Sequence, residues 1–191
     1  MSKPQKEKLH AEFNHNAYLY AKDFANRWMQ KVGKRRNKKS EVFDRFIATY
    51  VSYAALVNVI KPQTCRNGND KEYCTEIMAT FIIDRSANIA TLIDKLNSVA
   101  IQLANVIETN HLSVVSSKGY NPNLLMNWNN GDSKTKLLSL LQTLYFLRCN
   151  LFHGAKEYDV DQINLLTNAS ECAKIINKEI LAIYSSMYLL S

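Results

Sequence analysis

Hydrophobic residues recur at every third or fourth position along most of this chain, which is the spacing that places them on one face of an α-helix. The pattern is clearest in residues 86–109, at Ile89, Leu92, Ile93, Leu96, Val99, Ala100, Leu103 and Val106. The same spacing predicts further helices, over residues 9–32, 40–60, 71–83, 134–153 and from 159 to the end. No alternation typical of a β-strand extends beyond a few residues. We therefore predict an all-α fold, an antiparallel bundle of five to six helices.

Turn-forming residues mark the connections between these helices. Ser40 is expected to cap one helix and Pro62 to end it, while Asp132 or Ser133 caps the helix at 134–153 and Gly154 closes it. The Asn-, Gly- and Pro-containing stretch 111–132 is predicted to be one long irregular loop. With only 5 glycines and 3 prolines among 191 residues, few connections are expected, and residues 1–191 read as a single domain.

Positive charge is concentrated in one segment. The net charge is +7, and residues 31–39, "KVGKRRNKK", hold six basic residues and no acidic one. A basic inter-helix loop of this kind attracts phosphate-bearing partners such as RNA. It is equally consistent with a solvated loop that binds nothing. The candidates for RNA contact are Lys34, Arg35, Arg36, Lys38 and Lys39.

Several classes of protein do not fit this sequence. The longest uncharged run, residues 46–60, is shorter than the roughly 20 residues needed to cross a bilayer. The charged N-terminal stretch lacks the apolar core of a secretory signal. Cysteines at positions 65, 74, 149 and 172 lack the spacing of a zinc site, although a Cys65–Cys74 disulfide stays open. We expect a cytoplasmic protein with reduced thiols, no membrane contact, no metal and no cofactor.

The segment "LYFLRCNLFHGAK", residues 144–156, carries the candidate chemistry. Arg148 can bind two oxygens of a phosphate with its planar guanidinium, and His153, with an ordinary pKa of about 6.5, can transfer protons near neutral pH. The two residues lie about 140° apart around a regular helix, so they meet only if the helix ends at His153 or across a dimer axis.

Three interpretations follow from these residue types. Arg148 and His153 could cleave a phosphodiester, Cys149 and His153 could form a nucleophile and base, or Arg148 and His153 could simply stabilise the negative end of the helix. The second interpretation needs an orienting group and an oxyanion hole, neither of which is identified. A cysteine in an apolar helix is more often part of the core.

The stretch "RCNLFHGAK", near the end of a helix and followed by one more amphipathic helix, resembles the HEPN superfamily, whose signature is Arg, four to six residues, then His. Residues 43–60, "FDRFIATYVSYAALVNVI", resemble an early helix of some bacterial members. This resemblance implies a HEPN-like helical bundle and a metal-independent endoribonuclease that leaves 2′,3′-cyclic phosphate ends. It also implies a homodimer in which Arg148 and His153 from two subunits form a composite active site.

The resemblance carries further expectations about partners and supporting residues. Many members are toxins paired with a nucleotidyltransferase-type antitoxin, or antiviral effectors. The family commonly has Asn, Asp or His directly after the arginine, where this chain has Cys149, so Asn150 is the candidate supporting residue. Lys156 is a candidate RNA contact. The alternative is a catalytically inactive HEPN-like module that binds a nucleotide, RNA or a partner protein.

Overall fold

The computed structural model describes residues 13–33, 39–62, 70–109, 114, 121–152 and 160–189. Within these residues every regular element is a helix. The longer helices are α1 (His15–Gly33), α2 (Lys39–Val57), α5 (Ile89–Thr109), α7 (Ser133–Phe152) and α8 (Val160–Leu189). The shorter elements are α3 (Asp70–Glu72), the π-helical segment η2 (Tyr73–Ile77), α4 (Met78–Arg85) and α6 (Leu124–Asn130). The all-α class predicted from the sequence is therefore confirmed for the described residues.

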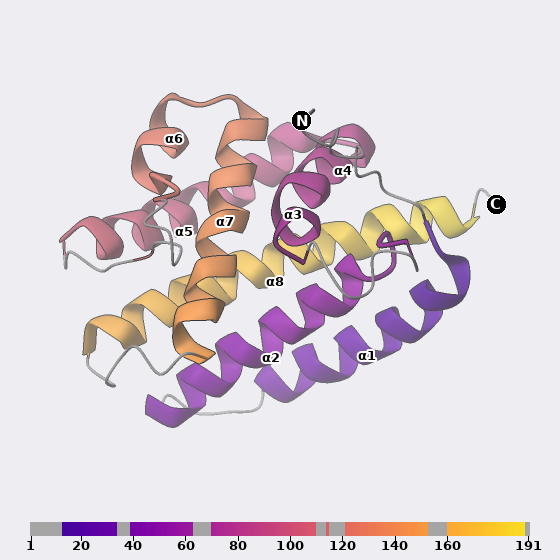
Figure 1. Cartoon of the computed structure of the whole chain (residues 1–191), viewed down its shortest axis with the longest axis horizontal. Helices are drawn as coiled ribbons and strands as arrows, with labels where there is room; N and C mark the ends of the chain where they lie inside the picture. The colour runs from indigo at the N-terminus through magenta and orange to yellow at the C-terminus, as the bar shows by residue number, and fades with distance from the viewer. Residues whose placement is uncertain are drawn as a thin grey trace, which may run out of the picture.

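The helices form a bundle in which α7 crosses the others (Figure 1). α1 and α2 are an antiparallel pair, α8 packs on α2, and α5 packs on α8. α2 and α8 run in the same direction, so the bundle is not antiparallel throughout (Figure 1). α7 contacts η2, α4, α5 and α6 and reaches α2 near its C-terminal end. This crossing brings the segment with the candidate chemistry against α2.

Short polar side chains begin several of these helices. The Asp132 carboxylate accepts a hydrogen bond from the backbone N–H of Thr135 at 2.7 Å, which caps α7. This bond, together with one to the Thr135 side chain, lowers the pKa of Asp132. Asn14 caps α1 in the same way, through the N–H of Ala17 at 2.9 Å. Of the two caps predicted for α7, Asp132 is the one used, whereas α2 already begins at Lys39, one residue before Ser40.

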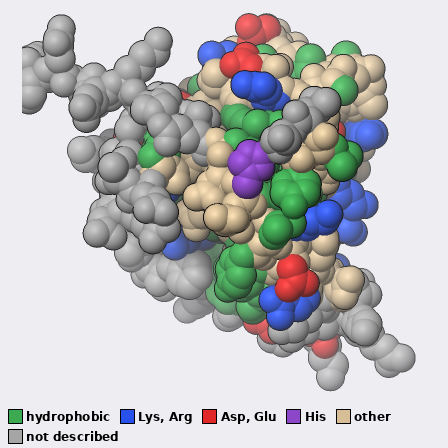
Figure 2. All heavy atoms as spheres, turned by 90° about the vertical axis from the view of Figure 1, so that its right-hand side faces the viewer, with side chains coloured by type: hydrophobic (Ala, Val, Ile, Leu, Met, Phe, Trp, Pro, Cys, Tyr) green, Lys and Arg blue, Asp and Glu red, His purple; other side chains and the backbone are tan. Residues whose placement is uncertain are grey.

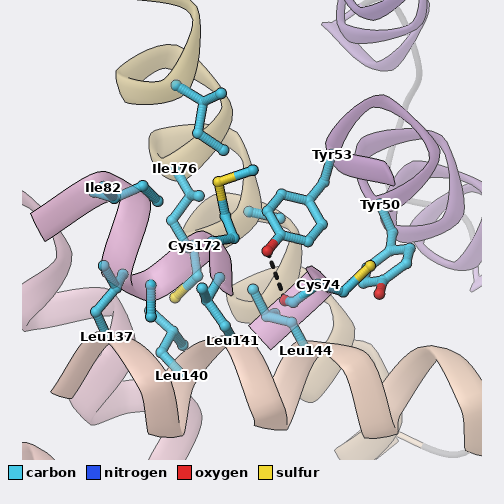
Figure 3. Packing of buried hydrophobic residues seen from close by; sticks show 14 of the residues in the cluster. Tyr50, Tyr53, Cys74, Ile82, Leu137, Leu140, Leu141, Leu144, Cys172 and Ile176 are labelled. Atoms are coloured by element: carbon cyan, nitrogen blue, oxygen red, sulfur yellow. Dashed lines mark hydrogen bonds between the residues drawn. The ribbon is translucent and has the colours of Figure 1, made fainter. Parts of the chain in front are cut away.

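The core is a continuous apolar cluster to which all the long helices contribute. Leu137, Leu140, Leu141 and Leu144 of α7 pack beneath η2 and α4, as Figure 3 shows. Several buried polar side chains within this core form hydrogen bonds with the backbone. Tyr184, for example, donates its hydroxyl hydrogen to the carbonyl oxygen of Leu56 at 2.8 Å. This bond joins α8 to the last turn of α2.

The stretch 111–132 was wrongly predicted to be irregular throughout, because it contains α6. Asn123 precedes this helix with a φ of 50°, a left-handed conformation that asparagine tolerates. Trp128 is buried against α5, where its indole N–H donates to Asn97 Oδ1 at 2.9 Å. At the end where α1 begins and α8 ends, hydrophobic side chains gather around a histidine (Figure 2).

None of the helices in the described part of the chain combines the length and the apolar character needed to cross a membrane.

Candidate functional site

Arg148 lies in the last turns of α7, directly after buried leucines. Leu144 and Leu147 are 1% and 2% exposed, so the backbone that carries Arg148 is anchored in the core. The Arg148 side chain itself is only partly buried. A guanidinium group is therefore held at the margin of the core, with part of it in reach of solvent. His153, Gly154 and Lys156 lie outside the described residues, so the predicted Arg148–His153 arrangement stays a prediction.

Two neighbours on α7 surround the guanidinium group. Arg148 Nη1 is 3.9 Å from Cys149 Sγ, a weak hydrogen bond to sulfur. Tyr145 lies one turn earlier on the same side of the helix. The pKa of Tyr145 is raised to about 12, first by burial and then by Cys149, while Arg148 opposes the shift. Burial disfavours the charged form of Arg148, but Cys149, Tyr50 and Tyr145 outweigh that effect and raise its pKa.

Two groups from other elements form the inner wall of this site. Tyr50 of α2 is 4% exposed, and Cys74 of η2 is 7% exposed. Their side chains point toward one another (Figure 3). Burial raises the pKa of Tyr50 well above its ordinary value, and Arg148 lowers it. The pKa of Cys74 is raised to about 11, first by burial and also by Asp70, whereas Tyr50, Lys61 and Arg148 act to lower it.

The Tyr50 hydroxyl differs from the other buried phenols of this region. Its oxygen is buried and forms no hydrogen bond of ordinary geometry with any of the residues that the structure describes. The Cys74 thiol influences its pKa, but a thiol is a weak partner. By contrast, Tyr53 donates its hydroxyl hydrogen to the carbonyl oxygen of Cys74 at 2.7 Å (Figure 3). That bond fixes the π-helical segment and, with it, the position of the Cys74 side chain.

Two lysines lie on the side of this region formed by α3. Lys61, whose side chain is 4% exposed, binds Asp70 at 2.5 Å and lies 5.9 Å from the centre of the Tyr73 ring. Lys71 Nζ lies 5.5 Å from the centre of the Phe146 ring. Both contacts are short enough for a cation–π interaction. Because Asp70 is paired with Lys61, its negative charge offsets the effect of this lysine on the Cys74 thiol.

The structure places the remaining candidate residues less favourably. Asn150 is partly exposed but follows Arg148 by two positions, about 160° around a regular helix, so α7 does not bring the two together. Lys39 begins α2, whereas Lys34, Arg35, Arg36 and Lys38 lie outside the described residues. Cys74 is a free thiol, so the open Cys65–Cys74 disulfide is not formed.

Tyr145, Tyr50 and Cys74 were not predicted as part of the site. Helical spacing alone could have pointed to Tyr145, which precedes Arg148 by three positions. The helical spacing of hydrophobic residues within 40–60 includes Tyr50 and agrees with its burial, but nothing local connects Tyr50 or Cys74 to Arg148. Among the described residues, no three His, Cys, Asp or Glu side chains gather in an arrangement that could hold a metal ion.

Comparison with protein-family models, with curated proteins and with solved structures gives no match.

Proposed function

We propose that this chain is a metal-independent endoribonuclease of the HEPN type, in which Arg148 and His153 from two subunits form a composite active site. The observation that carries the proposal is the position of Arg148. It stands in the last turns of a core helix, partly open to solvent, among phenol and thiol groups that are neutral at physiological pH. Four residues separate it from a histidine that can transfer protons.

The proposed reaction is cleavage of RNA by its own 2′-hydroxyl group. His153 takes the proton of that hydroxyl or gives one to the departing 5′-oxygen, and the 2′-oxygen bonds to phosphorus as the 5′-oxygen leaves. Arg148 stabilises the negative charge that grows on the phosphoryl oxygens. The products are a 2′,3′-cyclic phosphate and a 5′-hydroxyl. No oxidant or other co-reactant is required.

Partners of this proposed activity follow from the same resemblance. We propose that six basic residues contact the RNA backbone: Lys34, Arg35, Arg36, Lys38, Lys39 and Lys156. Asn150 is kept as a proposed supporting residue. A nucleotidyltransferase-type antitoxin is proposed as the protein partner if the chain acts as a toxin. An antiviral effector role would require only RNA and a second subunit. In each case we place the protein in the cytoplasm, where RNA is available.

The decisive test is RNA cleavage by the purified chain in EDTA. We expect products with 2′,3′-cyclic phosphate ends, at least a hundredfold slower cleavage by His153→Ala, and a similar loss in Arg148→Ala. Arg148→Lys is the matched control, because it keeps the charge and loses the planar fork that binds two oxygens. We expect it to retain only part of the activity.

Two results would contradict this proposal. One is cleavage by His153→Ala at the rate of the parent protein. The other is an absence of cleavage by the parent under all conditions while it binds a nucleotide in calorimetry. The second result would favour the catalytically inactive HEPN-like module, and the presence of Cys149 in place of the polar residue common in the family is the observation behind that alternative.

A further inference from the structure

Three aromatic side chains form a strip along the outer side of α1. Tyr20, Phe24 and Trp28 are spaced by four residues, and the centres of successive rings are 6.0 Å and 6.0 Å apart. Tyr20 is 68% exposed, and Phe24 and Trp28 are partly exposed. The neighbouring side of α1 faces the core through Tyr18, Ala21 and Ala25, which is why Phe24 and Trp28 are less exposed than Tyr20. We call Tyr20, Phe24 and Trp28 the aromatic strip.

An ion pair lies along one flank of the aromatic strip. Arg27 Nη2 is 2.8 Å from Asp23 Oδ2, and these side chains are 61% and 67% exposed. Regular helix geometry places both residues on the same side of the strip. Aromatic residues and arginine are enriched at protein interfaces. Because the charges of Asp23 and Arg27 offset one another, this flank offers no net positive charge to an RNA backbone.

We infer that the aromatic strip is the docking surface for a second copy of this chain, with the two α1 helices packed antiparallel around a two-fold axis near Phe24. In that arrangement the two Phe24 rings lie side by side. Tyr20 of one copy then faces Trp28 of the partner subunit. Each strip is thus covered by the same three residues of the other copy, as a two-fold contact requires.

The charges of α1 select this arrangement. A two-fold axis perpendicular to the helices brings the same flank of both copies together, so each Asp23 faces the flank that carries Arg27 of the partner subunit. With a rise of about 1.5 Å per residue, the two are offset by about 3 Å along the helix, a distance that an arginine side chain spans. A parallel arrangement would place them on opposite flanks, where no pair could form.

This contact is independent of the proposed ribonuclease activity. α1 lies along one edge of the molecule, and α2 lies between it and the end of α7 (Figure 1). The aromatic strip therefore contains no residue of the candidate site. If the composite site also forms, each chain takes part in two different two-fold contacts, which together build an even-numbered assembly.

A pair of charge-reversal variants tests the docking surface. Asp23→Arg leaves two arginines on the flank, and Arg27→Asp leaves two aspartates, so neither variant keeps the ion pair between positions 23 and 27. In multi-angle light scattering we expect each variant alone to show about half the particle mass of the parent, because like charges face each other at the two-fold contact. A 1:1 mixture should recover the parental mass, since each arginine then faces an aspartate.

Circular dichroism of each variant verifies that the helices remain folded, and RNA cleavage by each should match the parent. The inference is overturned if the parent is a monomer, if either variant keeps the parental mass, or if the mixture does not recover it. It is also overturned if Asp23→Arg binds a fluorescent single-stranded RNA more tightly and Arg27→Asp more weakly with no change in mass. That result would identify the strip as an RNA-binding surface.

Discussion

Replacing Tyr50 and Tyr53 with phenylalanine, one at a time, distinguishes a buried hydroxyl that forms a hydrogen bond from one that does not. The residues lie three positions apart on α2 and are 4% and 1% exposed. Each substitution removes the same oxygen atom and leaves the ring in place. The Tyr53 hydroxyl donates to the Cys74 carbonyl oxygen at 2.7 Å, whereas the buried Tyr50 hydroxyl forms no hydrogen bond of ordinary geometry with any described residue.

The two substitutions should therefore differ in their effect on the free energy of unfolding. Tyr53→Phe leaves the Cys74 carbonyl without this donor inside the core, which costs about 1–3 kcal/mol. For a chain of this size that lowers the unfolding midpoint by roughly 2–4 °C per kcal/mol. Tyr50→Phe removes a polar group that was buried without compensation. We expect its unfolding free energy to be unchanged or to rise by up to about 1 kcal/mol.

Urea unfolding followed by circular dichroism measures both values, with equal slopes indicating that the two-state comparison is valid. Tyr184→Phe is the matched control, because its buried hydroxyl donates to the Leu56 carbonyl at 2.8 Å and its loss should resemble that of Tyr53→Phe. Equal destabilisation by Tyr50→Phe and Tyr53→Phe would refute the reasoning, because it would mean that the Tyr50 hydroxyl is bonded in solution.

Two further predictions concern Cys74 and Gly131. Between about pH 9 and pH 11 the unfolded chain releases the Cys74 proton while the folded chain keeps it, so the unfolding free energy falls as pH rises, by roughly 3 kcal/mol in total. Cys74→Ala should lose that much less over the same range in urea titrations, and an identical loss would contradict the prediction. Gly131→Ala places a Cβ 2.5 Å from the Asn127 carbonyl oxygen and 2.8 Å from Thr135, so it should lower the unfolding free energy by about 1–3 kcal/mol. A thermal midpoint equal to that of the parent would contradict it.

The long helices could be predicted from the sequence because their signal is local. The hydrophobic spacing of residues 86–109 and 134–153 corresponds closely to α5 and α7. The helix α6 escaped prediction because its stability depends on a distant partner. Trp128 is held by Asn97, on a different helix, and the asparagines around it favour turns when they are read alone. Local propensity and tertiary packing conflict there, and packing decides the outcome.

The candidate site was only partly predictable for a related reason. Arg148 attracts attention because an arginine interrupts an apolar helix, and the residues that share its helix follow from helical spacing. Tyr50 and Cys74 reach it only because α7 crosses the bundle and η2 lies against it. Nothing in the sequence around these two residues indicates that crossing. Their hydrophobic surroundings predict burial, which is correct, but they do not reveal which charge lies next to them.

The chemical character of these neighbours has a consequence for Arg148. Tyr50, Cys74 and Tyr145 are all acids whose pKa values are raised, so they remain neutral at physiological pH and do not cancel the positive charge of Arg148. Carboxylates in the same positions would be ionised and would compete with an incoming phosphate. A phenol and thiol wall can therefore support the arginine stem in the core while leaving its charge available to an anion. The same wall would lose this property in alkali, as Cys74 and then Tyr145 ionise near pH 11 and 12. The proposed RNA binding through Arg148 should accordingly weaken at high pH before the guanidinium group itself loses its proton.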